Sequence, residues 1–268
     1  MPTESRAAAL ARLYDLDLAE DPGDLDLYLA LAGRVAGPIV ELAVGTGRVA
    51  VPLAAAGHRV VGVDADPSML ARARARADRA GADVAGRLEL VEADLVEADR
   101  AAANAGTFGM AILALNSILL LSERGRQRAA ISTMARLLAP GGIAVVDTWL
   151  PEAADLAGFD GRLSLEWLRT DPETDLEVTK VAAAWYDPAT RVVTLTTIFE
   201  EGEPGSQPAR WTRSDALRLT SADELQAHAE DAGLVVEQLA GDYELSPFGP
   251  GSDRVILIGR RPGSAGSP

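Results

Sequence analysis

The sequence predicts an α/β fold built on a doubly wound, mostly parallel sheet. First, short apolar runs alternate with helical stretches from residue 38 to residue 148, which is typical of βαβ units. Second, residues 151–220 show no helical period and instead alternate apolar and polar residues, as an antiparallel meander does. Third, a late helical stretch is followed by two further apolar runs. We therefore expect an α/β core with a meander inserted before its last helix, and no linker that divides the chain into independent domains.

The core elements follow from the apolar runs and their spacing. Strands are predicted at residues 38–43, 59–63, 88–91, 110–115 and 143–147. Helices are predicted between them, at residues 48–56, 67–79 and 124–138. Pro140 and the following Gly141-Gly142 pair are expected to end the last of these helices.

The rest of the chain is predicted in the same way. Strands of the meander are expected at residues 163–167, 178–186, 191–200 and 211–219. A helix is expected to begin at Ser221, because Ser221 and Glu224 have capping-box spacing, and to end near Gly233. Two strands, at residues 234–239 and 254–258, would follow. The tail at residues 261–268 is rich in Gly, Ser and Pro, and we expect it to be disordered.

The composition excludes several chemistries. The chain has 268 residues, 40 acidic against 25 basic side chains, a net charge of −15, two histidines and no cysteine. Without cysteine there is no disulfide, thiol nucleophile or thiolate zinc site, and we expect no metal. The negative charge argues against nucleic acid or an anionic membrane as the main partner. No targeting segment is visible, and the longest apolar stretch is shorter than the roughly 20 residues of a membrane span. We expect a soluble, cytoplasmic chain.

The most informative stretch is IVELAVGTGR at residues 39–48, which combines a strand, a glycine-rich turn and the start of a helix. Gly45 and Gly47 let the backbone approach a ligand closely, and the helix that follows offers free N–H groups. Residues 45–50 also match the G-x-G-x-x-A variant of the dinucleotide fingerprint. Asp64, at the end of the second strand, could accept hydrogen bonds from both ribose hydroxyls. NAD is therefore one candidate ligand.

Three features favour a different ligand. Glu41 places a carboxylate beside the turn where a dinucleotide would place its pyrophosphate, and like charges repel, whereas a cationic or zwitterionic ligand is tolerated. After Asp64, Pro67 is positioned to open a helix. Asp94 closes the third strand and is followed by Leu95, a pair that suits an adenine ring whose amino group donates to the carboxylate.

In this order and spacing, the segments ELAVGTGR, GVDADPSML, EADL and ALNSILLL resemble the motifs of class I S-adenosylmethionine-dependent methyltransferases. The family's loop usually reads E/D-x-G-x-G-x-G, and here Ala43 stands in place of the first glycine. The resemblance covers residues 38–148 strongly and extends weakly to the last helix and two strands. Those strands would complete a seven-stranded sheet with an antiparallel C-terminal hairpin. The implied cofactor is S-adenosylmethionine (SAM).

The resemblance implies roles for the residues around the glycine-rich loop. Gly45 and Gly47 would lie under the methionine part of the cofactor, and Glu41 would lie near its amino end. Asp64 would hold the ribose hydroxyls, although a helix cap is the structural alternative for this residue. The backbone around Leu115 would face the methionine part.

The resemblance also implies an adenine site. Ala65 and Met69 would line the ring, Leu95 would pack on it, and Asp94 would accept a hydrogen bond from its amino group. Each residue has a structural alternative: Asp94 could serve only a turn, and Met69 taken alone is more typical of core packing.

Fewer residues indicate where the methyl acceptor would bind. Tyr14 and Tyr28 precede the first strand, as in small-molecule N-methyltransferases that act on glycine or amino sugars, where residues like 1–36 here cap the cofactor. Packing of an amphipathic helix is the alternative. Asn116 would face the reacting methyl group. Trp149, at the sheet edge, is expected to line the acceptor site, and the inserted residues 151–220 would form its lid. Tyr14, Asn116 and Trp149 are the candidate catalytic residues.

No imidazole base can be assigned. Related amino-sugar enzymes can place a histidine after the Asn/Ser of the fourth strand, but here Ile118 follows Asn116 and Ser117. His58 is expected to be structural and His228 to lie on the surface. Methyl transfer depends mainly on holding the reactants in line, and a base is needed only for a protonated or weakly acidic acceptor.

The sequence therefore predicts a SAM-dependent methyltransferase with an amine as the favoured small-molecule acceptor. The alternatives are an O-methyltransferase, an NAD-dependent dehydrogenase and a non-catalytic protein that binds the cofactor. We expect no nucleic acid and no membrane among the partners, and a homodimer is left open.

Overall fold

The structure is a computed structural model that describes residues 4–101, 105–203 and 205–263, and the chain forms two compact units. The meander unit consists of Met1–Glu20 and Pro151–Leu219, and the core unit consists of Asp21–Leu150 and Thr220–Pro268. Each unit therefore joins two segments that lie far apart in the sequence. The tail expected to be disordered falls partly outside the described residues, since residues 264–268 are among those not described.

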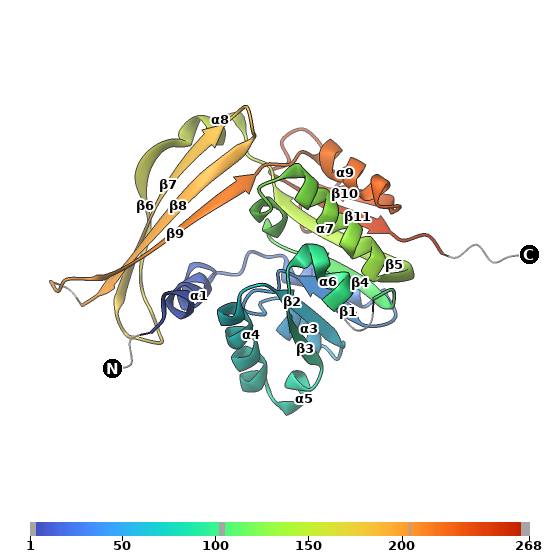
Figure 1. Ribbon diagram of the computed structural model, residues 1–268, viewed down its shortest axis with the longest axis horizontal. Helices are drawn as coiled ribbons and strands as arrows, with labels where there is room; N and C mark the ends of the chain where they lie inside the picture. Colours follow the sequence, from blue (N-terminus) through green and yellow to red (C-terminus); the bar gives the residue numbers. More distant parts are fainter. Residues whose placement is uncertain (1–3, 102–104, 204, 264–268) are drawn as a thin grey trace, which may run out of the picture. The chain divides into compact units, whose positions relative to one another are not determined.

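The core unit contains a seven-stranded sheet with the strand order β10-β11-β5-β4-β1-β2-β3 (Figure 1). Its strands are β1 (Ile39–Leu42), β2 (Val60–Asp64), β3 (Leu88–Glu92), β4 (Phe108–Leu113), β5 (Leu138–Trp149), β10 (Val235–Ala240) and β11 (Arg254–Arg260). The first five strands pair in parallel, β11 runs antiparallel to β5, and β10 runs antiparallel to β11. The predicted α/β fold with an antiparallel C-terminal hairpin is confirmed.

Helices connect the strands of the core unit. They are α2 (Leu25–Ala32), α3 (Ala50–Ala55), α4 (Pro67–Ala80), α5 (Ala82–Ala85), α6 (Ala98–Ala101), α7 (Arg124–Leu137) and α9 (Ala222–Asp231), with short 3-10 turns at η1 (Leu95–Glu97) and η2 (Ser117–Leu120). Two of the helix starts follow sequence rules. Asp66 accepts a hydrogen bond from the Ser68 N–H at 2.8 Å ahead of Pro67, and Ser221 accepts one from the Glu224 N–H at 3.2 Å.

The central strands are buried on both faces. Every residue of Phe108–Leu113 is buried, as is every residue of Ile39–Leu42. Strands covered by helices on both sides read as continuous apolar runs, not as alternating patterns. This is why the core strands were predictable from the sequence.

One prediction in the core is wrong. The Gly141-Gly142 pair does not end a helix, because α7 stops at Leu137 and residues 138–149 already form β5. A Cβ atom on Gly142 would lie 2.7 Å from the carbonyl oxygen of Phe108. The glycine therefore allows two neighbouring strands to approach at a register shift between Phe108 and Met110.

The meander unit contains a four-stranded antiparallel sheet with the order β6-β7-β8-β9. Its strands are β6 (Asp160–Thr170), β7 (Glu177–Asp187), β8 (Val192–Gly202) and β9 (Ala209–Arg218), and its helices are α1 (Arg6–Asp17) and α8 (Ala153–Gly158). The antiparallel meander is as predicted. The expectation that residues 151–220 hold no helix is wrong: Glu152 and Asp155 form a reciprocal capping box that starts α8.

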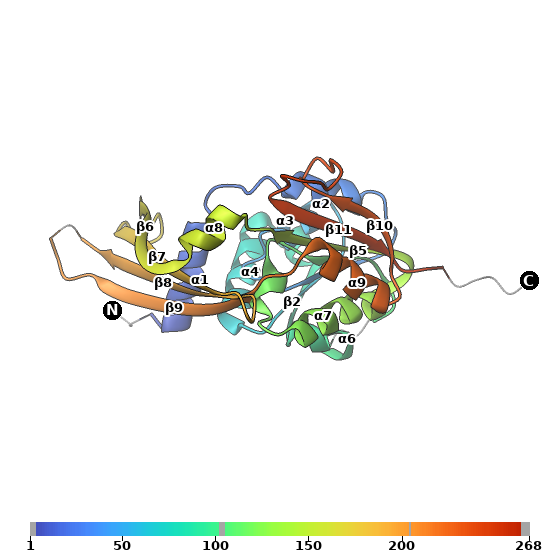
Figure 2. The ribbon, with the colours of Figure 1, turned by 90° about the horizontal axis from the view of Figure 1, so that it is seen from above.

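Helix α1 packs on one face of the four-stranded sheet (Figure 2). Leu13 and Leu16 of α1 form a small apolar cluster with Val178 and Phe199. Residues 1–36, expected as one cap, are thus divided: α1 belongs to the meander unit and α2 to the core unit.

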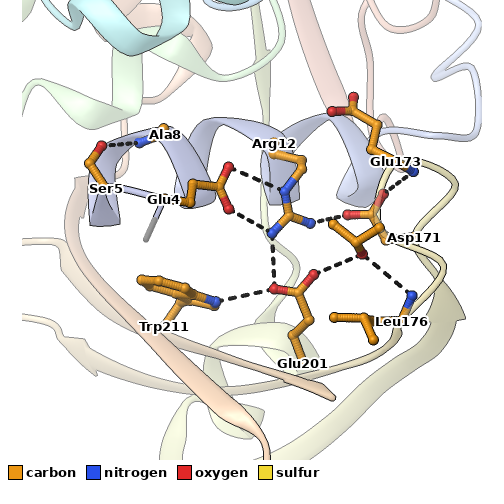
Figure 3. Close-up of polar contacts among 10 residues, drawn as sticks. Glu4, Ser5, Ala8, Arg12, Asp171, Glu173, Leu176, Glu201 and Trp211 are labelled. Atoms are coloured by element: carbon orange, nitrogen blue, oxygen red, sulfur yellow. Dashed lines mark hydrogen bonds and ion pairs between the residues drawn. The ribbon is translucent and has the colours of Figure 1, made fainter. Parts of the chain in front are cut away.

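A buried ionic network also ties α1 to the meander (Figure 3). Arg12, only 5% exposed, forms ion pairs with Asp171, with Glu201 at 2.9 Å and with Glu4 at 3.0 Å. Burial alone would lower the pKa of Arg12, but its hydrogen bonds with Glu4 and Glu201 raise the pKa above its ordinary value. Thr174 adds a hydroxyl donor to Glu201 at 3.0 Å. The guanidinium is therefore the common partner of carboxylates from three separate stretches of chain.

In the part of the chain that the structure describes, no helix is both long and apolar enough to cross a membrane.

Candidate functional site at the carboxyl edge of the parallel sheet

The parallel strands deliver the predicted polar residues to one edge of the core sheet. Glu41 lies on β1, Asp64 ends β2, Asp94 follows β3, Asn116 follows β4 and Trp149 ends β5. Parallel strands place their carboxyl ends on the same side, and ligands of doubly wound sheets bind there. The structure therefore gathers these five residues at the expected edge.

The loop after β1 is held in a left-handed conformation and is tied to β2. Ala43, Gly45 and Gly47 have φ angles of 54°, 54° and 78°. The Gly45 N–H donates to Oδ2 of Asp64 at 2.8 Å, and the Asp66 N–H donates to Oδ1 at 2.9 Å. Burial raises the pKa of Asp64, and these N–H groups oppose that rise. Each carboxylate oxygen can accept a further hydrogen bond, so Asp64 keeps capacity for ribose hydroxyls.

Two glycines allow the loop to pack closely. A Cβ atom on Gly47 would lie 3.2 Å from Cβ of Ala73 on α4, and one on Gly62 would lie 2.8 Å from a methyl carbon of Val44. Gly62, in the middle of β2, therefore leaves room for the loop. Gly62 is not among the residues predicted from the sequence, although a glycine inside a buried strand signals close backbone approach.

Glu41 is buried next to a charged pair. Its side chain is 3% exposed, and among the described residues its Oε2 has no hydrogen-bond partner. Asp24, which is fully buried, binds both terminal nitrogens of Arg48 at 2.5 and 2.6 Å. Burial raises the pKa of Glu41 to about 8, although the charge of Arg48 and the N–H of Ala50 oppose this. The site thus holds a buried carboxyl group with one oxygen that the described residues leave without a hydrogen bond.

Tyr28 lies in the same buried region. It is fully buried, and its hydroxyl group has no hydrogen-bond partner within residues 4–101, 105–203 and 205–263. Burial and the nearby Asp147 and Asp24 charges raise the pKa of Tyr28 above its ordinary value. Its expected role as a cofactor residue remains a prediction.

Asp147 forms a second buried pair at the edge. Its carboxylate accepts hydrogen bonds from the Tyr243 hydroxyl at 3.0 Å and from Nη1 of Arg254 at 2.7 Å. The guanidinium of Arg254 also lies over the Tyr243 ring, 4.2 Å from its centre. Five residues of this edge were not predicted as site residues from the sequence: Asp24, Arg48, Asp147, Tyr243 and Arg254.

On the adenine side, Asp94 already has protein partners. It accepts a hydrogen bond from the Val96 N–H at 3.0 Å, which starts η1, and from Nη2 of Arg126 at 2.6 Å. Burial would raise the pKa of Asp94, but these two donors lower it overall. The structural alternative, a turn residue, is therefore realised, and the contact with an adenine amino group remains a prediction. Ala65 is exposed, while Met69 and Leu95 are half-buried.

Asn116 and Trp149 are brought together. Leu115 and Asn116 have φ angles of 42° and 65°, so the chain leaves β4 in the left-handed region. Oδ1 of Asn116 accepts a hydrogen bond from the Trp149 N–H at 2.6 Å, and the Asn116 N–H donates to the Asp147 carbonyl at 3.1 Å. Strained backbone of this kind concentrates at functional sites. Here it fixes the ends of β4 and β5 to each other.

The remaining candidates lie elsewhere. Tyr14 is half-buried on α1 in the meander unit, so it is not among the residues that the core unit assembles. The expectation that His228 lies on the surface is wrong, since it is only 2% exposed. It shares the packed face of α9 with Leu225 and Ala229, and this helical spacing was visible in the sequence. His58 is half-buried.

The comparisons with known proteins agree with this geometry. Residues 39–142 match the family model described as a methyltransferase domain. The chain is 30% identical to the cypemycin N-terminal methyltransferase of a Streptomyces species over 225 aligned residues. The aligned region covers 82% of this chain and 81% of that protein. A local match of 46% over 48 residues links it to an uncharacterized RNA methyltransferase of Parasynechococcus marenigrum, of which this chain spans only 10%.

Similar solved structures are also methyltransferases. The CcbJ methyltransferase of Streptomyces caelestis is 25% identical with a TM-score of 0.75, over 91% of this chain and 97% of that one. The sugar N-methyltransferase KedS8 of a Streptoalloteichus species is 19% identical, with a TM-score of 0.70 over 93% and 92% of the two chains, and shows the same fold. The G-x-G-x-x-A match therefore lies within a methyltransferase domain, and the alternative of an NAD-dependent dehydrogenase is overturned. The cypemycin N-terminal methyltransferase, matched over 81% of its length at 30% identity, shows that this chain belongs to the class I SAM-dependent methyltransferases.

Proposed function

We propose that this enzyme transfers the methyl group of SAM to the nitrogen of a small-molecule amine. The observation that carries the proposal is the 30% identity to an N-terminal methyltransferase over 81% of its length. By its name, that relative modifies an amine. The fold match to a sugar N-methyltransferase adds support. An amine that arrives neutral needs no general base, which agrees with the scarcity of histidine in the sequence.

The core unit fits the cofactor of the family. The buried, unpartnered Oε2 of Glu41 is an acceptor suited to an ammonium group, and the carboxylate of Asp64 retains lone pairs for ribose hydroxyls. Gly45 and Gly47 hold the loop in the left-handed conformation that brings backbone close to a ligand. We assign the remaining cofactor contacts within the core unit to Tyr28, Ala65, Met69, Asp94, Leu95 and Leu115, and the contact expected of Tyr14 stays a prediction.

In this reaction the protein acts mainly by holding the two reacting groups in position. When bound, SAM supplies an electrophilic methyl group on a sulfonium. Holding an amine nitrogen in line with such a group, away from water, removes most of the barrier. We assign Asn116 to fixing this edge of the sheet, because its side chain binds the Trp149 backbone at 2.6 Å. Trp149 is proposed to contact the acceptor, while the acceptor contact expected of Tyr14 and the lid role of residues 151–220 remain predictions.

Matched acceptor pairs test the proposal. One pair is an amino-sugar nucleotide and its hydroxyl counterpart, and the other is a short peptide with a free or an acetylated N-terminus. S-adenosylhomocysteine release is measured for each, and mass spectrometry locates the added methyl group. We expect methylation of at least one amine and of neither control. Methylation of the hydroxyl compound alone would replace the proposal with O-methylation.

A further inference from the structure

One face of the four-stranded meander sheet has no charged side chain over its central part. Residues that lie directly opposite each other in an antiparallel pair point to the same side of the sheet. The observed registers therefore define one face, made of Leu163, Leu165 and Leu168 of β6, the odd-numbered residues 179–185 of β7, and the even-numbered residues 194–198 of β8 and 212–216 of β9. None of these residues is charged. We call this surface the uncharged face.

The opposite face of the same sheet is already covered. Val178 and Phe199 point to that side, because each lies one residue along its strand from a member of the uncharged face. Both pack against Leu13 and Leu16 of α1. Helix α1 thus covers one side of the sheet and leaves the uncharged face as its second, outer side.

The uncharged face is apolar and open. Leu163, Leu165 and Leu168 are 65%, 67% and 60% exposed, and Trp185 is 54% exposed. Among the residues that the structure describes, the only other exposed large apolar side chains are Leu120 and Val235. Most of the exposed large apolar side chains therefore gather on this one surface, and patches of this kind mark interaction sites.

The size of the uncharged face suits a protein partner. Four strands and seven residues along β7 span about 19 Å by 24 Å, or roughly 450 Å² in projection. Each partner in a standard protein–protein interface contributes about 800 Å². The face can supply more than half of that area, and the residues around it would supply the rest as a rim.

Charged residues lie where the uncharged face ends. Asp160 and Asp187 follow Trp185 at one end, and Glu177 and Glu200 follow Thr179 at the other. An apolar centre that lacks charge, contains an aromatic side chain and has a polar rim is the usual composition of a protein–protein interface.

A second copy of this chain is the partner that fits best. In a two-fold symmetric contact each copy presents the same surface, so a surface with charges of one sign repels itself. The chain has a net charge of −15, and repulsion between copies is weakest where no charged residue faces the partner. A basic protein would favour an acidic surface and an anionic membrane would favour a basic one, and the uncharged face offers neither.

We propose that two copies of this chain associate through their uncharged faces, with the two four-stranded sheets packed face to face about a two-fold axis. Sheets packed in this way interdigitate the side chains of their inner faces. Leu163, Leu165, Leu168 and Trp185 would then be buried by the partner. The inference concerns assembly and is independent of the acceptor proposed above.

Analytical ultracentrifugation of the full chain, without any ligand, tests the association. Measurements from about 1 to 100 μM cover dissociation constants in the micromolar range. We expect dimers of the wild type within this range. A wild type that stays monomeric throughout would overturn the proposal.

Two matched variants locate the contact. Leu165→Glu places a carboxylate on the uncharged face of each copy, and we expect the dissociation constant of the dimer to rise at least tenfold. Val235→Glu adds the same charge at an exposed apolar residue of β10, 56% exposed, and should leave the dimer unchanged. Equal effects of the two variants would place the contact elsewhere. Melting curves establish that each variant folds, and Trp185→Ser replaces Leu165→Glu if that variant melts early.

Cross-linking gives an independent test that leaves most of the face intact. The chain has no cysteine, so one introduced cysteine is the only thiol. Sheets packed face to face lie about 10 Å apart, so a bis-maleimide with a spacer of about that length should join two copies of Thr196→Cys. Ser164→Cys is the control, because Ser164 is exposed and pairs with Ala182 on the side of α1. Cross-linking of Ser164→Cys but not of Thr196→Cys would overturn the face-to-face arrangement.

Discussion

Asp64 shows how one carboxylate can serve both the fold and a ligand. Its two oxygens accept backbone N–H groups of Gly45 and Asp66 at 2.8 and 2.9 Å, which fixes the glycine-rich loop against β2. The same oxygens keep lone pairs for further donors, and Asp64 lies at the edge where ligands of this fold bind. Asp94 differs, since one of its oxygens is bound by the charged guanidinium of Arg126 at 2.6 Å and not by a backbone N–H.

We therefore expect Asp64→Ala to weaken S-adenosylhomocysteine binding by roughly 2–4 kcal/mol, because two charge-assisted hydrogen bonds are lost. Asp94→Ala should weaken binding less, because one amino-group contact is lost and packing on the ring remains. Calorimetric titration of both variants tests the ranking. Binding by Asp64→Ala within a factor of two of wild type would show that the ribose placement is wrong.

Trp149 is the residue on which the acceptor assignment depends most. Its backbone N–H, and not its side chain, makes the 2.6 Å bond to Asn116, so Trp149→Ala leaves that link in place. We expect turnover or acceptor affinity to fall more than tenfold, or about 1.4 kcal/mol. Cofactor affinity and melting temperature should stay near wild type. Early melting, or normal turnover, would place the indole ring in the structural core.

Ala43 occupies a conformation that favours glycine. Its φ angle is 54°, and the left-handed region costs a residue with a Cβ atom roughly 1–2 kcal/mol. This explains physically why the family prefers glycine here. We expect Ala43→Gly to raise the free energy of unfolding, because the strain at this position is relieved. The gain should be no more than about 1 kcal/mol, because glycine also has more conformational freedom in the unfolded chain, which offsets part of it. Denaturant unfolding checks this, and a clear loss of stability would mean that the methyl group packs favourably.

Among the helices and strands, those that depend on residues close together in the sequence could be predicted from the sequence. The strands of the core were found because burial on both faces produces continuous apolar runs. The acids at the sheet edge were found because each closes such a run. Helix α8 and the early start of β5 were missed, since the first depends on a short capping box and the second on glycine packing against Phe108.

The pairings behind the site could not be found in the same way. Tyr243 binds Asp147 across 96 residues of sequence, and Arg254 binds it across 107. Nothing local marks such partners, because they meet only once β11 has paired with β5. The same holds for Arg126, which binds Asp94 from helix α7, 32 residues along the sequence.

The ion pairs of Arg12 hold helix α1 on the meander sheet. Arg12→Ala would leave Asp171 and Glu201, which are 2% and 6% exposed, without their buried cation. Removing one partner of such a network costs about 3–5 kcal/mol. We expect denaturant unfolding and limited proteolysis to show early loss of the meander unit.

The matched control is Arg162→Ala. Arg162 is 88% exposed in its pair with Asp160, and exposed pairs contribute little. Its removal should change stability by less than about 0.5 kcal/mol. Equal effects of the two substitutions would show that the buried network contributes no more to the free energy of unfolding than an exposed ion pair does.

For the whole molecule, the net charge of −15 makes stability depend on pH in two ways. Repulsion among surface carboxylates rises as they ionise and is screened by salt. Buried carboxyl groups act separately, and salt screens them less. Glu41 is the clearest case, because burial raises its pKa from 4.5 to about 8. Between these two values the folded protein holds a proton that the unfolded chain has lost, so stability must fall as the pH rises through this interval.

Glu41→Gln isolates that contribution from the surface charges. Glutamine cannot ionise, so the difference in unfolding free energy between the variant and wild type should grow in favour of the variant from pH about 5 to 8. The expected change is about 2–4 kcal/mol, from 1.36 kcal/mol per unit of pKa difference. Denaturant unfolding of both proteins in matched salt across this range measures it. Saturating S-adenosylhomocysteine should shrink the difference, because the ligand's ammonium group compensates the ionised carboxylate. A difference that stays constant with pH would mean that Glu41 ionises in the folded protein as it does in the unfolded chain.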